Sequence, residues 1–195
     1  IRLVPCCRRD FQPGPGENPG DSMELAGSPL VYGGRVFIGV VKSPQYGQPS
    51  DCYLMCFELR SGRVLWQRFI GSGSPLAFRD GGNGLSLMSP ATDGRTIFVE
   101  SAVGSLAAID LATGQTRWAR RLPWPKAQSS YEMPTIAWPS NVGTSPTVVD
   151  GRVIVSEIGR AGMCCFDAQT GRRLWSVPSV AGGQRLGASN RRVIV

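Results

Sequence analysis

The sequence predicts an all-β fold, part of a β-propeller with about three four-stranded antiparallel blades. Two repeated patterns predict it. In three places an acidic residue, a glycine and a tryptophan follow one another at steps of four residues, and each copy lies downstream of a Ser-Pro pair and a Gly-Arg pair. The tryptophans, Trp66, Trp118 and Trp175, recur about every 55 residues, which suits a four-stranded blade with a generous connection.

Each repeat is expected to contain four short strands. Strand A follows the Ser-Pro pair, where proline is tolerated because it stands at the start of a strand. Strand B follows Gly-Arg, strand C leads into the acidic residue, and strand D carries the tryptophan. One such sheet cannot bury both faces alone, so it stacks on its neighbours around an axis. The predicted B strands are 35–40, 95–101 and 152–157, the C strands 52–58, 105–110 and 162–167, and the D strands 63–69, 115–122 and 172–177.

The repeats define the expected blade boundaries. Residues 28–69 are predicted to form blade 1, residues 70–121 an inter-blade loop and blade 2, and residues 122–177 a long inter-blade loop and blade 3. Residues 1–27 precede them as an N-terminal segment compatible with the end of a preceding blade. Residues 178–195 are expected to start a further blade, because SNRRVIV at their end aligns with VDGRVIV at 149–155. We therefore expect a segment of a longer protein, whose ring would use about six to eight blades.

The order Ala-x-Asp-x-x-Thr-Gly-x-x-x-Trp at residues 108–118 resembles the tryptophan-docking motif of the PQQ-like β-propeller repeats. That family holds quinoprotein alcohol dehydrogenases and the non-enzymatic lipoprotein of the β-barrel assembly machinery, and this chain is closer in style to the lipoprotein. The resemblance covers about residues 28–175. Two cysteines stand where the motif has alanine and one glutamate where it has aspartate, which weakens the match to the dehydrogenases more than the match to the fold. The motif positions are Cys56, Glu58, Gly62, Trp66, Ala108, Asp110, Gly114, Trp118, Cys165, Asp167, Gly171 and Trp175.

The resemblance implies a packing role for each tryptophan. Its ring is expected to lie flat between the glycine peptide of its own blade and the small first motif residue of the next, with the indole N–H bonded to a backbone carbonyl. Trp66 would then rest on the motif of Ala108, and Trp118 on the motif of Cys165. Trp175 would have no partner in this chain.

The net charge of +7 raises the question of nucleic-acid binding. The arginines are spread over repeated turn tips, as at Arg35, Arg95 and Arg152, rather than gathered in one stripe with aromatic residues. This distribution favours an ordinary solvated surface, so we expect no nucleic-acid partner. No apolar run approaches the length of a membrane span, and no secretory signal is visible in these residues.

The six cysteines do not have the spacing of a small disulfide scaffold. Cys52 and Cys56 lie about 13 Å apart along one predicted strand, too far to bridge. The adjacent pair at 164–165 lies inside strand C, where successive side chains point to opposite faces. A disulfide between neighbouring cysteines shields the quinone in some dehydrogenases of the resembling family, and Cys6 with Cys7 stays open as such a pair, in an undetermined redox state. With no histidine in the chain, no zinc site is predicted.

No catalytic residue is predicted. The absence of histidine removes imidazole bases from these residues. The glycines at 79–86 are not followed by Gly-Lys-Ser/Thr and are read as part of an inter-blade loop. Asp110 and Asp167 each stand before a turn, where we expect them to cap backbone N–H groups.

The functional prediction comes from topology. In an antiparallel blade the A–B and C–D turns lie at one end, and these are tight. The long segments 42–51, 71–88 and 123–141 all belong to the opposite end. Loops on a rigid scaffold are common binding sites, so we expect ligand or partner contacts there. The alternative is that Trp124 and Trp138 only pin a long connection onto the propeller. The candidate binding residues are Tyr46, Trp124, Lys126, Tyr131, Glu132 and Trp138.

Two functional classes follow. The favoured one is a non-catalytic scaffold that binds protein partners or the rest of its own propeller, with no cofactor, no membrane span in this segment and, by resemblance, a periplasmic or other extracytoplasmic location. The alternative is a segment of a PQQ- and calcium-dependent alcohol or sugar dehydrogenase. That class needs clustered oxygen ligands, for which Asn83, Glu132 and Asn141 are scattered candidates.

Overall fold

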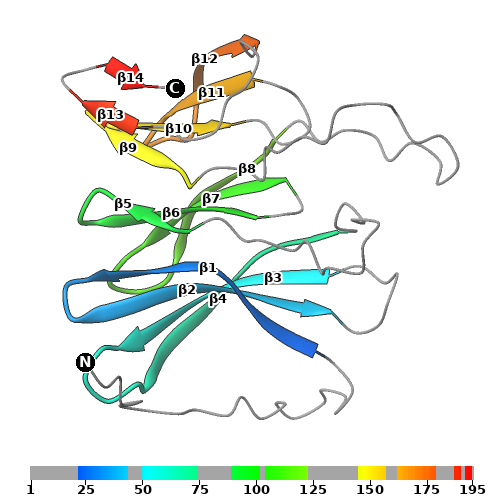
Figure 1. The fold of residues 1–195 in the computed structure, drawn as a ribbon, viewed down its shortest axis with the longest axis vertical. Coiled ribbons are helices and arrows are strands. Elements are labelled where there is room, and N and C mark those ends of the chain that lie inside the picture. The colour runs from blue at the N-terminus through cyan, green and yellow to red at the C-terminus, as the bar shows by residue number, and fades with distance from the viewer. Residues whose placement is uncertain are drawn as a thin grey trace, which may run out of the picture.

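The computed structural model describes residues 22–43, 50–73, 89–101, 104–122, 145–156, 162–178, 187–189 and 192–194. These residues form strands and turns, and no helix that could span a membrane occurs among them (Figure 1). The strands are β1 (Ser22–Tyr32), β2 (Arg35–Ser43), β3 (Ser50–Glu58), β4 (Val64–Gly73), β5 (Ala91–Thr92), β6 (Thr96–Ser101), β7 (Ser105–Asp110), β8 (Thr116–Arg121), β9 (Thr147–Val149), β10 (Arg152–Ser156), β11 (Gly162–Asp167), β12 (Arg173–Pro178), β13 (Gly187–Ser189) and β14 (Arg192–Ile194).

The strands form three four-stranded antiparallel meanders in chain order, β1 to β4, β5 to β8 and β9 to β12. We call them blades 1, 2 and 3. Strands β13 and β14 form a two-stranded hairpin. The predicted all-β architecture of partial propeller blades is confirmed.

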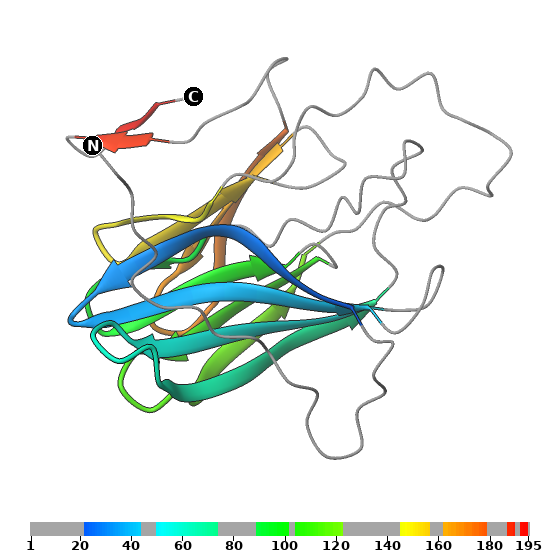
Figure 2. The same ribbon diagram turned by 60° about the horizontal axis from the view of Figure 1, so that its bottom comes forward.

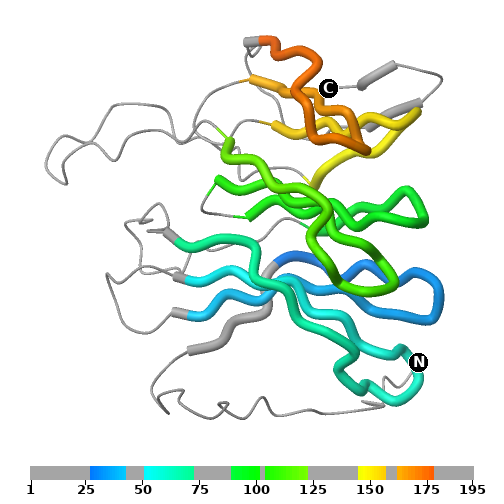
Figure 3. The backbone as a smooth tube through the Cα atoms, turned by 180° about the vertical axis from the view of Figure 1, so that it is seen from behind, coloured from blue at the N-terminus to red at the C-terminus, as the bar shows by residue number. Residues whose placement is uncertain are grey.

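The blades stack face to face in sequence order, as Figures 2 and 3 show. The first strand of each later unit lies along the same side of the stack, since β9 contacts both β5 and β13. Strand A of each repeat is therefore the inner strand, and strand D, with the tryptophan, lies at the outer edge. This is the arrangement expected of sheets that fan about a common axis.

Blade 1 differs from the prediction at its start. Strand β1 begins at Ser22, well before the Ser-Pro pair, whereas β5 and β9 begin directly after theirs. The pairing of β1 with β2 shifts register between Ala26 and Leu30. Pro29 lies inside this irregularity, where its missing N–H costs no ladder bond, and so the strand continues past it.

Hydrophobic side chains form a core on each side of blade 2. Every residue of β6 is buried, because its successive side chains point alternately into the two cores. Ile97 and Val99 pack with blade 1, whereas Phe98 packs with blade 3. The second strand of a middle blade is therefore almost continuously apolar. It lacks the alternation of polar and apolar residues that is typical of a sheet with one solvent-exposed face.

The A–B and C–D turns of each blade are joined to each other by backbone hydrogen bonds. The amides of Leu59, Leu111 and Ala168, in the three C–D turns, donate to the carbonyls of Gly34, Arg95 and Gly151 in the A–B turns, each at 2.9 or 3.0 Å. We call this end of the stack the turn rim. The B–C and D–A connections leave from the opposite end, which we call the connection rim.

Candidate functional site

Each tryptophan that faces a following blade lies against a glycine of that blade. A Cβ added to Gly114 would fall 2.5 Å from Cδ2 of Trp66, and one added to Gly171 would fall 2.6 Å from Cδ2 of Trp118. Both glycines have positive φ, +71° and +66°, which L side chains rarely adopt. The glycine is therefore needed for the turn and for the close approach of the ring.

The small motif residue lies in the tryptophan's own blade. Ala108 is the direct cross-strand partner of Trp118, and Cys56 is that of Trp66. The ring thus lies between the small residue of its own blade and the glycine of the next blade, and the sequence-based expectation, which exchanged these two roles, was wrong. The reason is that strands C and D are neighbours in one sheet, so paired residues share a face.

The indole N–H groups of the two interfaces differ in their partners. Nε1 of Trp118 donates to the carbonyl of Ala168 at 2.9 Å. Nε1 of Trp66 is buried with no acceptor. At the first interface the corresponding carbonyl, that of Leu111, accepts instead from Nη1 of Arg35 at 2.7 Å. The expected bond therefore forms only where no arginine takes the carbonyl.

An arginine two residues after the tryptophan fastens each interface. Nε of Arg68 donates to the Gly114 carbonyl at 2.5 Å, and Nε of Arg120 donates to the Gly171 carbonyl at 2.7 Å. Sequence reasoning missed this contact, although Trp-x-Arg at 66–68 and 118–120 is a visible signal. In the third repeat Val177 occupies the arginine position. It is 43% exposed, and Trp175 is 39% exposed, compared with 7% for Trp118.

The motif aspartates cap turns, as predicted. Oδ1 of Asp110 accepts from the amide and the hydroxyl of Thr113, and Oδ1 of Asp167 accepts in the same way from Thr170. Arg117, 2.7 Å from Asp110, together with Thr113 lowers the pKa of the Asp110 carboxyl to about 2. Hydrogen bonds from Thr170 lower the pKa of Asp167. Both groups are therefore stabilised as carboxylates by their own turns.

None of the four cysteines in the described residues forms a disulfide, as predicted for the pair 52 and 56 and the pair 164 and 165. Burial raises the pKa of Cys52 to about 12 and that of Cys56 to about 11. A thiol with so little thiolate at neutral pH is a poor nucleophile and metal ligand. These side chains therefore act as small apolar packing groups. Cys6 and Cys7 lie outside the described residues.

Glu100 is a buried acidic residue that the sequence analysis did not single out. It lies in β6 with no exposed surface, and neither carboxyl oxygen has a hydrogen-bond partner. Its cross-strand partner is Leu106, and Phe98 lies two positions along the same face. Burial raises its pKa well above the ordinary value, because desolvation disfavours the charged form.

We expect Glu100→Gln to raise the free energy of unfolding at pH 7.5, by an amount that shrinks toward pH 4. The unfolded chain ionises this glutamate above about pH 4.3, whereas burial raises its pKa in the folded state and opposes ionisation there. The contribution of the Glu100 carboxyl to the free energy of unfolding is therefore fully present at low pH. It is lost as the pH rises toward the pKa of this group in the folded state. Urea unfolding at several pH values measures the difference between the variant and the wild type.

The matched control for this prediction is Glu58→Gln. Glu58 accepts a hydrogen bond from the Ser61 hydroxyl and lies 3.9 Å from Arg63, so its replacement should not stabilise the protein. A stability difference between Glu100→Gln and wild type that stays constant from pH 4 to pH 7.5 would contradict the prediction.

The residues expected to bind a partner are not placed by the structure. Tyr46, Trp124, Lys126, Tyr131, Glu132 and Trp138 lie outside the described residues, as do Asn83 and Asn141. The segments that contain these residues join β2 to β3, β4 to β5 and β8 to β9. The strand ends on either side of each segment lie at the connection rim.

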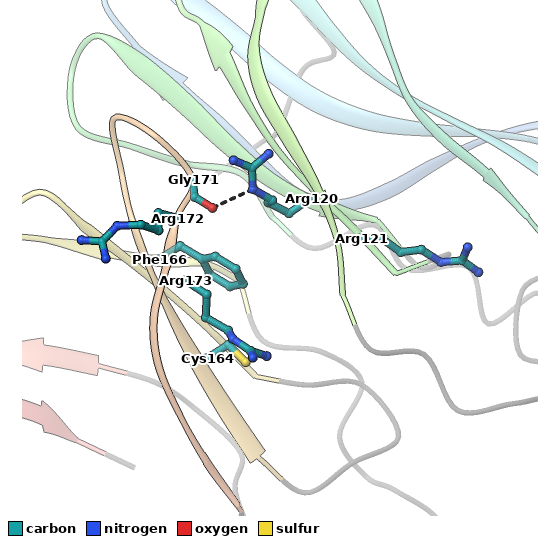
Figure 4. A pocket seen from close by; sticks show the side chains of 7 residues that line it. All are labelled: Arg120, Arg121, Cys164, Phe166, Gly171, Arg172 and Arg173. Atoms are coloured by element: carbon teal, nitrogen blue, oxygen red, sulfur yellow. Dashed lines mark hydrogen bonds between the residues drawn. The ribbon is translucent and has the colours of Figure 1, made fainter.

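A cavity of about 430 Å³ opens between the outer strands of blades 2 and 3. Four arginines line it: Arg120 and Arg121 from the end of blade 2, and Arg172 and Arg173 from blade 3 (Figure 4). Cys164, Phe166 and Gly171 complete the lining. The cavity therefore combines a basic wall with a partly apolar floor.

Two family models match the chain. The one described as outer membrane protein assembly factor BamB matches residues 15–120, and the one described as the β-propeller domain of glucose/ethanol/alcohol dehydrogenase matches residues 86–189. No curated protein matches the sequence.

Solved structures share the fold. BamB from Moraxella catarrhalis is similar with a TM-score of 0.50 and 18% identity, over 83% of this chain and 55% of that one. The quinohemoprotein alcohol dehydrogenase ADHIIG from Pseudomonas putida HK5 has a TM-score of 0.51 and 23% identity, over 82% of this chain and 23% of that one. The computationally designed Ika4 protein has a TM-score of 0.52 and 10% identity, over 95% and 91%. This chain thus spans little more than half of the BamB structure and under a quarter of the dehydrogenase.

Proposed function

The chain belongs to the PQQ-like β-propeller repeat family, and from that premise we propose that it is a non-catalytic scaffold that binds a protein partner or ligand through its connection rim. The observation that carries this proposal is the difference between the two rims. In each blade the polar groups of the turns bond to one another, while the long connecting segments leave from the other end. Binding residues tend to lie on such connections of a rigid framework.

Bonds between blades add to the rigidity of the turn rim. Nη1 of Arg35 in blade 1 donates to the carbonyls of Leu111 and Ala112 in blade 2, at 2.7 and 3.0 Å. Nη2 of Arg120 donates to the Thr170 carbonyl of blade 3 at 2.9 Å. Carbonyls that already accept these bonds have less capacity to recognise a partner. The connection rim is then the better candidate surface.

The experiment replaces Trp124, Lys126 and Trp138 together by alanine in the intact protein. Proteins captured from an envelope extract are compared by quantitative mass spectrometry with those captured by the wild type. We expect a defined partner to be lost. The matched control replaces three exposed turn-rim residues, Arg60, Gln115 and Gln169, and should retain it. Equal capture by both variants, with circular dichroism unchanged, would overturn the proposal.

We further propose an extracytoplasmic location, in keeping with the family resemblance. Fractionation of cells that produce the intact protein should place it with envelope proteins. Recovery with the cytoplasmic fraction alone would contradict the location without bearing on the binding surface.

The second candidate function is that of a segment of a PQQ- and calcium-dependent dehydrogenase, favoured by the match of residues 86–189 to a dehydrogenase propeller model. The described residues assemble no group of three or more His, Cys, Asp or Glu side chains that could hold a metal ion. The buried carboxyl of Glu100, which has no hydrogen-bond partner, lies among apolar side chains.

Reconstitution of the intact protein with PQQ and calcium separates the two functions. The scaffold proposal expects no protein-bound quinone absorbance after removal of free cofactor, and no alcohol-dependent reduction of an electron-accepting dye. A bound quinone band together with that activity would establish the second candidate.

A further inference from the structure

The arginine-lined cavity between blades 2 and 3 lies at the outer edge of the stack. Arg120 and Arg173 approach it from opposite sides, one on the last strand of blade 2 and the other on the last strand of blade 3. Figure 4 shows the Arg173 side chain running beside Phe166 to Cys164, while the side chains of Arg172 and Arg121 extend outward in opposite directions. Arginines from two blades therefore line one opening.

The repeat supplies an internal comparison for this cluster. The equivalent position between blades 1 and 2 has Arg68 in place of Arg120, so that arginine is a shared feature of both interfaces. The other three positions differ: Phe69, Gln115 and Thr116 stand where the second interface has Arg121, Arg172 and Arg173. Because the first interface packs without these three charges, the stacking of blades does not require them.

The shared arginine is already bonded. Arg120 donates from Nε to the Gly171 carbonyl, from Nη2 to the Thr170 carbonyl and from Nη1 to the Ala119 carbonyl. These bonds fasten blade 3 and leave little of this guanidinium for a ligand. Its role at the cavity is to hold the two walls together.

The other three arginines have little compensation. Arg63 pairs with Glu58 and Arg117 with Asp110, and neither of these ion pairs involves the cavity. Arg172 is partly balanced by its attraction to Asp167, whose carboxylate already accepts bonds from Thr170. A cleft lined by charges of one sign over a low-dielectric floor concentrates counter-ions.

We propose that this cavity binds a small anion carrying two or more negative charges, as carboxylate or phosphate groups, through Arg121, Arg172 and Arg173. The guanidinium fork matches both groups in bidentate geometry. All three side chains are exposed, so they can turn inward on binding, as interface side chains commonly do. Phe166 and Cys164 offer an apolar surface for the body of the ligand, and the volume lies within the range of small-molecule sites.

Calorimetric titration of the intact protein with pyrophosphate and with citrate tests the proposal. We expect saturable binding of at least one, and the tighter of the two identifies phosphate or carboxylate as the preferred group. The double variant R172Q/R173T introduces the glutamine and the threonine found at the equivalent positions of the first interface. The blades stack at that interface, so these residue types are compatible with stacking. The double variant should weaken binding about tenfold or more, because two charge-assisted hydrogen bonds are lost.

The matched control, R60Q/R95T, removes the same two charges from exposed turn tips outside the cavity and should leave the affinity within about twofold. Arg121→Ser, on a different strand, should weaken binding independently of any effect on blade 3. Absence of saturable binding of both probes, or equal weakening by cavity and control variants, would overturn the proposal. The alanine variant at Trp124, Lys126 and Trp138 should bind the anion normally, so the two proposals fail separately.

Discussion

Replacing Trp118 with alanine is expected to lower the free energy of unfolding by about 3–5 kcal/mol, the usual cost of deleting a large buried aromatic side chain. Trp118 belongs to the core between blades 2 and 3 and is 7% exposed. Its ring centroid lies 6.0 Å from that of Phe98, and its N–H donates to the Ala168 carbonyl. The substitution leaves a void between two blades and a carbonyl without its donor.

Urea unfolding of the intact protein measures this loss. Trp118→Phe is the matched control, because it keeps much of the apolar ring and deletes the N–H donor. We expect it to cost about 1–2 kcal/mol. If Trp118→Ala lowered stability by less than about 1 kcal/mol, the indole would not be the main contact between these blades.

Gly171→Ala is expected to cost about 2–5 kcal/mol, because a conformational cost and a steric cost act at the same residue. At φ +66° an alanine is strained by about 1–2 kcal/mol. Its Cβ would also lie 2.6 Å from Cδ2 and 2.7 Å from Cε3 of Trp118. The ring is fixed by its hydrogen bond and by Phe98, so relief of this contact requires the blades to separate.

Gly151→Ala separates the two costs. Gly151 has φ +70° and nothing within 4 Å of the position of a Cβ, so its replacement should show the conformational cost alone. Urea unfolding, with tryptophan fluorescence as the probe, should give a clearly larger loss for Gly171→Ala. Equal losses at the two positions would mean that the ring does not need the space beside Gly171.

The tryptophan contacts were predicted from the sequence only in part. The family resemblance correctly paired Trp66 with the repeat of Ala108, and Trp118 with the repeat of Cys165. It did not reveal that the glycine in contact with each ring comes from the following blade. Ala108 and Cys165, which were expected to contact the tryptophan of the preceding blade, instead lie beside the tryptophans of their own blades. Spacing along the chain gives the residues of a contact but not the side from which each one approaches.

The contacts of the charged residues were a second feature that the sequence did not predict. Solvated turn tips were predicted at Arg35, Arg95 and Arg152, and Arg95 and Arg152 are indeed exposed. Arg35 instead bonds to carbonyls of the next blade, as do Arg68 and Arg120 on the last strands of their blades, about 46 to 77 positions along the chain. The Trp-x-Arg pattern marks Arg68 and Arg120, but no local pattern distinguishes Arg35 from an exposed arginine. The same applies to Glu100, whose burial depends on the blade stacked against its strand.

The sequence by itself determined the strands, the turns and the capping aspartates of each repeat, because neighbouring strands of a meander pair through residues close together in the chain. The tertiary structure alone decided how the blades meet: which glycine receives each ring, why Trp66 Nε1 has no acceptor while Trp118 Nε1 bonds to Ala168, and how four arginines surround one cavity. These features arise between sheets, where the contacting residues lie about one repeat apart in sequence and only stacking brings them together.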